Sequence, residues 1–316
     1  MISPAPSSGR ERRGPSQIRV VIALSLVYLV WGSTYLAMRI ALGGFPPLLM
    51  AGLRFTAAGG ALFVALRLRG VAAPSLSQWA RSAVVGILML TLGNGGVAIA
   101  EQWVASGLAA VVVASVPLWA ALFNGFFDRW PSRLETLGLA VGTGGVLLLN
   151  LGGDFRGQPL GAAVLLGASA SWALGSVWSR QMDLPQGLMA STAQMLSGGA
   201  ALLLLALLHG DRPLPGASAT PLLAIVYLAL FGSIVAFSAF GYLLRNVSPT
   251  LATSYAFVNP GIAVLLGVGF AEEQIRWTTV LAMAVILGGV ALVAIKPRPP
   301  LARVGQAPSL DCEERC

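Results

Sequence analysis

The side chains that could perform acid–base, metal or nucleophilic chemistry are scarce in this chain of 316 residues. The single histidine is His209, and the two cysteines, Cys312 and Cys316, lie close to the C-terminus. A zinc site of the His/Cys type, a Cys–His dyad and a Ser–His–Asp triad all need more than this inventory supplies. The chain also has no GxxxxGK phosphate loop, which argues against ATP as its energy source. The sequence therefore predicts a protein that is not an enzyme and that has no cofactor and no metal site.

Two charged residues stand out because they lie in or beside long apolar stretches. Arg54 lies well inside the apolar run 46–66, where a charge costs several kcal/mol unless it faces a cavity or a partner. Its planar guanidinium suits a substrate carboxylate or phosphate, whereas the alternative is a structural arginine bonded to carbonyl groups at a helix break. Glu101 ends another run, where it could gate, carry a proton or pair with Arg39 or Arg54. The alternative to a functional role is that Glu101 is an interfacial glutamate that begins a loop. For Arg39, the alternative is that its side chain reaches the lipid headgroups.

Aromatic and amide side chains inside the apolar runs could line a binding cavity. Trp31 and Tyr35 are four positions apart, so they share one face of a helix. An aromatic-lined cavity would suit amino acids or drug-like solutes, whereas packing, lipid contact and hydrogen bonds between helices are the alternatives. The candidate aromatics are Trp31, Tyr35, Trp119, Trp172 and Tyr255, and the candidate amides are Asn94, Gln194 and Asn259.

The elements that must position these residues are membrane helices. The chain is 56% apolar and only 10% charged, whereas soluble domains carry about 25% charged residues. Continuous apolar stretches without alternation, such as Ala200–Leu208, argue against a β-barrel, whose strands alternate strictly. The apolar runs that contain such stretches have the length of membrane-spanning helices, about 20 residues. Ten spans are predicted, at about 19–40, 46–66, 80–100, 103–125, 134–151, 159–179, 187–208, 221–244, 250–270 and 277–296.

The distribution of positive charge predicts how these spans are oriented. The formal net charge is +8, but the basic residues are not gathered as they would be for nucleic acid. Fifteen of the 20 Lys and Arg fall on one side of the ten-span arrangement, and four fall on the other: Arg39, Arg156, Arg212 and Arg276. The excess of positive charge in cytoplasmic loops places both termini in the cytoplasm and predicts no nucleic-acid partner.

The sequence also contains an internal duplication. The matches are Gly32-Ser33 with Gly175-Ser176, residues 45–61 with 184–200, Pro117 with Pro260, and Gly144-Gly145 with Gly288-Gly289. Each unit holds five predicted spans, and an odd number makes the second unit enter the membrane from the opposite side. Such inverted repeats are typical of secondary transporters, whose substrate site lies near the midplane between the halves.

Pro117 and Pro260 lie inside the fourth and ninth predicted spans. Each removes a backbone donor and frees a carbonyl group, so a symmetric pair of breaks fits a hinge or binding site. The alternative is that proline is simply common in membrane helices. The repeated Gly-Gly pairs favour close helix packing, with a homodimer interface as the alternative.

Three segments resemble a known family: residues 28–39 (YLVWGSTYLAMR), 46–55 (PPLLMAGLRF) and 93–118 (GNGGVAIAEQWVASGLAAVVVASVPL). They are similar to the EamA-type members of the drug/metabolite transporter superfamily, and the resemblance extends over about residues 19–296. It implies a ten-helix transporter made of two five-helix repeats. Members of the family move amino acids, metabolites or drugs, often outward.

Together these observations predict an all-α polytopic membrane protein of ten transmembrane helices in two inverted repeats. The expected parts are a disordered cytoplasmic tail over 1–17, repeats over 18–151 and 159–297, and a second disordered tail over 298–316. The predicted function is a secondary transporter of the bacterial cytoplasmic (inner) membrane that exports amino acids or related small metabolites by alternating access about Pro117 and Pro260. Its partners are a small-molecule substrate and the lipid bilayer. A passive facilitator, a transporter of drugs or lipid-linked substrates, and a membrane assembly subunit remain as alternatives.

Overall fold

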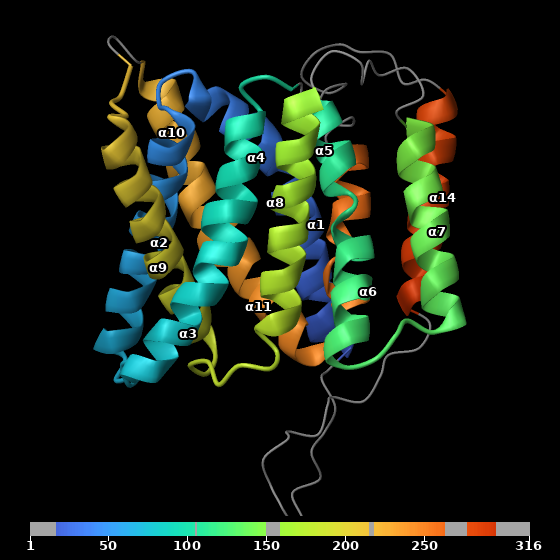
Figure 1. Ribbon diagram of the computed structural model, residues 1–316, viewed down its shortest axis with the longest axis horizontal. Helices are drawn as coiled ribbons and strands as arrows, with labels where there is room; N and C mark the ends of the chain where they lie inside the picture. Colours follow the sequence, from blue (N-terminus) through green and yellow to red (C-terminus); the bar gives the residue numbers. More distant parts are fainter. Residues whose placement is uncertain (1–16, 105, 150–158, 215–217, 263–276, 295–316) are drawn as a thin grey trace, which may run out of the picture.

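The computed structural model is a bundle of helices that stand roughly parallel to one another (Figure 1). The structure describes residues 17–104, 106–149, 159–214, 218–262 and 277–294, and every regular element among them is helical. The expected C-terminal tail and nearly all of the expected N-terminal tail lie outside the described residues.

Six helices are long and apolar enough to cross a membrane. This finding confirms the predicted class, a helical multi-pass membrane protein, because about 20 apolar residues span the hydrocarbon core. Four of the six are single elements: α1 (Gln17–Leu42), α2 (Pro47–Leu68), α8 (Pro159–Trp178) and α9 (Leu188–His209). The other two are Leu76–Ala100 and Ala219–Asn246.

Each of these last two helices contains an eight-residue π-helical segment. The first is built from α3 (Leu76–Gly86), η1 (Ile87–Asn94) and α4 (Gly95–Ala100). The second is built from α10 (Ala219–Tyr227), η3 (Leu228–Val235) and α11 (Ala236–Asn246). In these two segments the helices depart from regular α-helical geometry. Such π-helical turns are rare in proteins overall, but those that occur are frequently found at functional sites.

Shorter helices complete the described part of the chain. They are α5 (Ser106–Val113), α6 (Val116–Phe127), α7 (Arg133–Leu149), α12 (Pro249–Ala252), the helical residues 255–262, and α14 (Trp277–Ala294). The predicted run 103–125 is thus divided at Ala114 and Ser115, and Pro117 lies in the first turn of α6. A proline in the first turn removes an amide that has no helical partner anyway. In the predicted run 250–270 the interruption lies at Thr253 and Ser254, ahead of Pro260, which is itself in a helix.

Two helix pairs stand at opposite ends of the bundle: α2 with α9, and α7 with α14 (Figure 1). Glycines let the backbones approach closely in both pairs. A Cβ added to Gly289 in α14 would come 2.6 Å from the backbone nitrogen of Gly142 in α7. A Cβ added to Gly199 in α9 would come 2.7 Å from the backbone nitrogen of Thr56 in α2. These small residues therefore serve packing within the chain.

Candidate functional site

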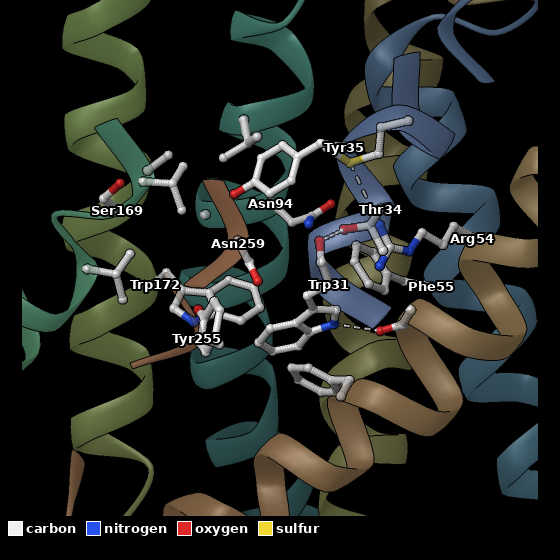
Figure 2. Close-up of a pocket in the computed structure, with 18 residues that line it drawn as sticks. Trp31, Thr34, Tyr35, Arg54, Phe55, Asn94, Ser169, Trp172, Tyr255 and Asn259 are labelled. Atoms are coloured by element: carbon white, nitrogen blue, oxygen red, sulfur yellow. Dashed lines mark hydrogen bonds between the residues drawn. The ribbon is translucent and has the colours of Figure 1, made fainter. Parts of the chain in front are cut away.

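A cavity lies in the middle of the bundle and receives side chains from both halves of the chain (Figure 2). Its walls come from α1, α2, η1, α4, α5, α6, α8, η3, α11 and the helical residues 255–262. The volume of the cavity is about 70 Å³. The cavity is therefore narrow, with room for a small group rather than for a bulky solute.

The structure brings seven of the nine predicted binding residues together in this cavity. They are Trp31, Tyr35, Arg54, Asn94, Trp172, Tyr255 and Asn259. The other two are placed elsewhere. Trp119 stacks on Phe123 with ring centroids 6.1 Å apart, and Gln194 is buried in α9 against α3. The cavity lining includes none of the four residues that were predicted for gating or coupling. These residues are Glu101, Arg39, Pro117 and Pro260.

Trp31 is the centre of an aromatic cluster at one side of the cavity. Its ring centroid lies 4.6 Å from that of Tyr255 and 5.5 Å from that of Trp172, both in edge-to-face geometry. Phe240 of α11 lies 5.1 Å from the same indole. The Trp31 Nε1 donates a hydrogen bond of 2.9 Å to the carbonyl oxygen of Gly232, as Figure 2 shows. This bond holds the ring of an α1 residue against η3, so the cluster joins both halves of the chain.

Arg54 is the buried charge of the site. Only 3% of the residue is exposed, and its Nε donates a hydrogen bond of 2.8 Å to Ser233 Oγ in η3. The guanidinium carbon lies 4.6 Å from the ring centroid of Phe55, a cation–π distance. Among the described residues no carboxylate forms an ion pair with Arg54. A buried guanidinium without an acidic partner is costly, so the cavity is electrostatically suited to an anionic group.

Ser233 holds Arg54 because η3 is π-helical. Its hydroxyl donates to the carbonyl oxygen of Leu228, five residues earlier, at 3.1 Å, and accepts from Arg54. The neighbouring Gly232 leaves room for the guanidinium, since a Cβ there would come 2.8 Å from Arg54 Nη2. A side chain at this position would therefore push Arg54 out of place.

Two amides present unused acceptors within the bundle. The Oδ1 atoms of Asn94 and Asn259 are buried and have no hydrogen-bond partner in the described residues. Asn94 ends η1, whereas Asn259 belongs to the helical residues 255–262, so one amide comes from each half. Because a buried polar atom without a partner costs free energy, both amides are suited to bind a ligand that donates hydrogen bonds.

Glu101 lies directly beyond the end of α4, outside the cavity. Both of its carboxylate oxygens are buried without a hydrogen-bond partner in the described residues. Burial raises the pKa of the Glu101 carboxyl to about 8, against a smaller opposite effect of Arg39. Arg39 itself lies exposed in the last turn of α1. The Glu101 carboxyl can therefore change its charge near neutral pH.

Some residues that line the cavity or position its side chains were not predicted from the sequence. Ser233 and Gly232 position Arg54, while Thr34, Met38 and Ser169 complete the wall. The Gly-Ser pair in the apolar run 221–244 was the only local signal for the first two. Nothing in the sequence pattern distinguishes Thr34 or Met38 from ordinary helix-packing residues.

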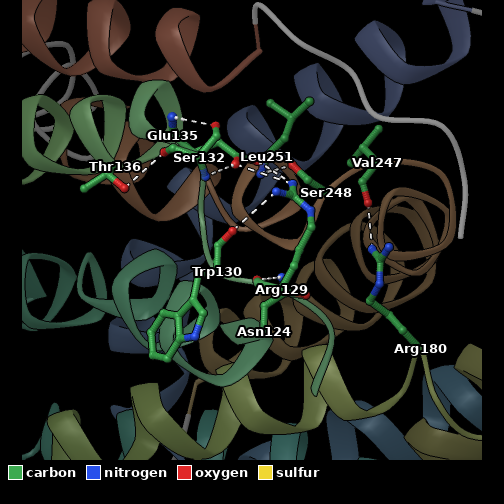
Figure 3. A network of polar contacts seen from close by, with 10 residues as sticks. All are labelled: Asn124, Arg129, Trp130, Ser132, Glu135, Thr136, Arg180, Val247, Ser248 and Leu251. Carbon is green, nitrogen blue, oxygen red and sulfur yellow. Dashed lines mark hydrogen bonds and ion pairs between the residues drawn. The ribbon is translucent and has the colours of Figure 1, made fainter. Parts of the chain in front are cut away.

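A second, polar cavity lies at the end of the bundle where α6, α8 and α11 finish. Figure 3 shows its network, in which Arg129 pairs with Glu135 at 3.3 Å and Asn124 donates to the carbonyl oxygen of Arg129. Arg180 donates from Nη1 to the carbonyl oxygen of Val247 at 2.6 Å. Burial lowers the pKa of Arg180, and the nearby Asp128 charge opposes this effect.

Comparison with known proteins identifies relatives over nearly the whole chain. The chain is 47% identical to the inner membrane transporter YedA of Escherichia coli over 274 residues, which cover 86% of this chain and 90% of YedA. It is 25% identical to the transporter YdfC of Bacillus subtilis, over 88% of this chain and 92% of that one. A solved crystal structure with 22% sequence identity superposes with a TM-score of 0.74, over 88% of this chain and 96% of the other. This last likeness shows the fold.

The six apolar helices and the relationship to YedA place the protein in the inner membrane, as the sequence predicts. The sequence profile of the EamA-like transporter family matches residues 18–151 and, a second time, residues 159–295. The predicted resemblance is thereby confirmed. The chain belongs to the EamA-like transporter family.

Proposed function

We propose that this protein is a secondary transporter that exports amino acids or related small metabolites by alternating access, with Arg54 binding an anionic group of the substrate. The observation that carries the proposal is the buried Arg54 guanidinium, which lines the central cavity and has no carboxylate partner in the described residues. A carboxylate or phosphate can accept two parallel hydrogen bonds from such a group.

Amino acids fit the remaining chemistry of the cavity. An ammonium group can donate to the unpaired Oδ1 atoms of Asn94 and Asn259. The rings of Trp31, Trp172 and Tyr255 can pack against an apolar side chain or attract a cation. The narrow space favours small solutes over large drugs or lipid-linked sugars.

The proposal includes ten spans in two inverted repeats of five, over residues 18–151 and 159–297, with both termini in the cytoplasm. Three observations support it. The family profile matches twice. The π-helical segments η1 and η3 occupy corresponding places, 141 positions apart. Corresponding elements also pack on each other across the bundle, α2 with α9 and α7 with α14, as a pseudo-two-fold axis requires.

Movement of one repeat against the other would expose the cavity to each side in turn. Pro117 and Pro260 lie close to the interruptions at Ala114-Ser115 and Thr253-Ser254, where hinge motion would cost least. Glu101 lies at the expected outer end and would couple transport to protons, since its carboxyl can titrate near neutral pH.

Flux from proteoliposomes tests this function. Vesicles would be loaded with amino acids, nucleosides and organic acids, and depletion would be read by mass spectrometry with and without a pH gradient. The proposal expects depletion of compounds that carry a carboxylate or phosphate. If the folded protein depletes none of these solutes, then a lipid-linked substrate or a role in membrane assembly takes its place.

A further inference from the structure

Arg180 ties the end of α8 to the end of α11. It follows Trp178, the last residue of α8, and its Nη1 donates to the carbonyl oxygens of Leu244 and Val247 at 2.7 and 2.6 Å. Leu244 lies in the last turn of α11, and Val247 is its C-cap. The last carbonyl groups of a helix have no partner inside it and attract positive charge. The Arg180 latch, meaning these two bonds, therefore stabilises one specific arrangement of the second repeat.

The duplication identifies the corresponding positions in the first repeat. Around the loop that follows α4 and the loop that follows α11, identical residues recur 143 positions apart. The identical pairs are Val104 with Val247, Leu108 with Leu251, Ala109 with Ala252 and Pro117 with Pro260. At this spacing the acceptor residues Leu244 and Val247 correspond to Glu101 and Val104.

Arg39 is the counterpart of the donor, Arg180, since each lies near the C-terminal end of the first helix of its repeat. Arg39 lies in the last turn of α1, and Arg180 lies two residues beyond Trp178, the last residue of α8. The two arginines are 141 positions apart, two fewer than the spacing of the loop residues. Because the repeats are inverted in the proposed topology, Arg39 and Glu101 lie at the outer end of the bundle, opposite to the Arg180 latch.

In the first repeat, the described residues do not form the contact that corresponds to the Arg180 latch. Arg39 is exposed and forms no hydrogen bond or ion pair with the described residues. The Glu101 carboxylate, by contrast, is buried with both oxygens unpaired in that part of the chain. The positive charge of Arg39 opposes the effect of burial on the pKa of the Glu101 carboxyl, although the two side chains form no ion pair in the described residues. One repeat thus has its arginine bonded to the helix end, and the other has the same parts separated.

We propose that Arg39 and Arg180 are gating latches that are closed in turn during transport. Arg180 closes the cytoplasmic ends of α8 and α11 in the arrangement seen here. When the repeats exchange their conformations, Arg39 bonds the carbonyl oxygens of Glu101 and Val104 and pairs with the Glu101 carboxylate, while Arg180 is released. Exchange of one latch for the other keeps the two states close in free energy, as reversible population of both requires. This inference rests on the inverted repeat of the proposed function.

Labelling of single cysteines from each side of the membrane tests the latches. The background would carry Cys312→Ser and Cys316→Ser, which removes both natural thiols. Thr250→Cys would report on the second cavity, at the cytoplasmic end, and Val97→Cys on the central cavity from α4. A membrane-impermeant maleimide would be applied to right-side-out and inverted vesicles without any substrate.

Opposite shifts are expected from the two latch variants. The measured quantity is the ratio of maleimide labelling at Thr250→Cys to labelling at Val97→Cys. Arg180→Ala is expected to raise this ratio about tenfold, and Arg39→Ala is expected to lower it. A tenfold shift corresponds to about 1.4 kcal/mol, which is close to the lower end of the contribution of one hydrogen bond to a charged group, about 1.5–3 kcal/mol. Arg245→Ala is the matched control, because Arg245 lines the same cavity but makes no hydrogen bond within the described residues.

Two results would overturn the latches: shifts in the same direction for Arg39→Ala and Arg180→Ala, or shifts no larger than that of Arg245→Ala. If Arg180→Ala does not fold, then Arg180→Lys, which keeps a donor, is expected to give a smaller shift in the same direction. Labelling needs no transported solute. Opposite labelling shifts without any solute flux would therefore support the latches and refute the proposed function. Solute flux without these labelling shifts would support the proposed function and refute the latches.

Discussion

Arg54 of α2 and Ser233 of η3 are joined by a hydrogen bond of 2.8 Å between Nε and Oγ, across 179 positions of the sequence. The bond links the first half of the chain to the π-helical segment of the second. Ser233 at the same time donates to the Leu228 carbonyl oxygen, so its position depends on the irregular backbone of η3. A single contact thus connects the buried charge, the helix irregularity and the interface between the halves.

Replacing Ser233 is expected to weaken substrate binding more than turnover. Ser233→Ala removes the acceptor that orients Arg54 but leaves the guanidinium in the cavity. The loss of a hydrogen bond to a charged group costs about 1.5–3 kcal/mol, so the KM for an anionic substrate is expected to rise about tenfold or more. Initial rates of flux over a range of substrate concentrations measure this. Ser238→Ala, on α11 but outside the cavity lining, is the control and should leave KM unchanged.

Protonation of Glu101 is expected to make stability depend on pH. Burial raises the pKa of its carboxyl to about 8, so the folded protein holds this proton more tightly than the unfolded chain does. The folded state therefore loses stability as pH rises between the ordinary glutamate pKa, about 4.3, and about 8. The Tm of the purified protein should fall across this range, and Glu101→Gln should flatten the fall. Equal slopes for both proteins in a thermal unfolding series would show that Glu101 does not titrate in this window.

Glycine at 289 is expected to be essential for the packing of α14 on α7. In Gly289→Ala the new Cβ would meet the Gly142 backbone nitrogen at 2.6 Å, and backbone atoms cannot move aside easily. Overpacking of this kind costs about 1–3 kcal/mol. A clear drop in Tm is expected for Gly289→Ala, whereas Gly288→Ala, whose Cβ would meet nothing within 4 Å, should unfold close to the wild-type temperature. A similar Tm for the two variants would contradict the close packing.

The helical class and most of the cavity could be predicted because they follow from local sequence. Long apolar runs define helices, and Arg54 and Trp31 are conspicuous inside such runs. The partners of these residues were not predictable in this way. Ser233 and Gly232 contact them where the π-helical η3 packs against α1 and α2, and a Gly-Ser pair alone reveals neither the irregular turn nor this pairing. Trp119 has the same residue type as Trp172 but faces Phe123 instead of the cavity, since helix rotation depends on the whole bundle.

The most direct test of the central claim is the flux of an anionic small solute through Arg54 variants in proteoliposomes. Arg54→Ala and Arg54→Lys would be compared with the wild type, each shown to be folded by its thermal unfolding profile. The account predicts a large loss of transport for Arg54→Ala and a partial loss for Arg54→Lys, because lysine keeps the charge but not the planar fork. Unchanged transport kinetics in both variants would contradict the assignment of Arg54 as the group that binds the substrate anion.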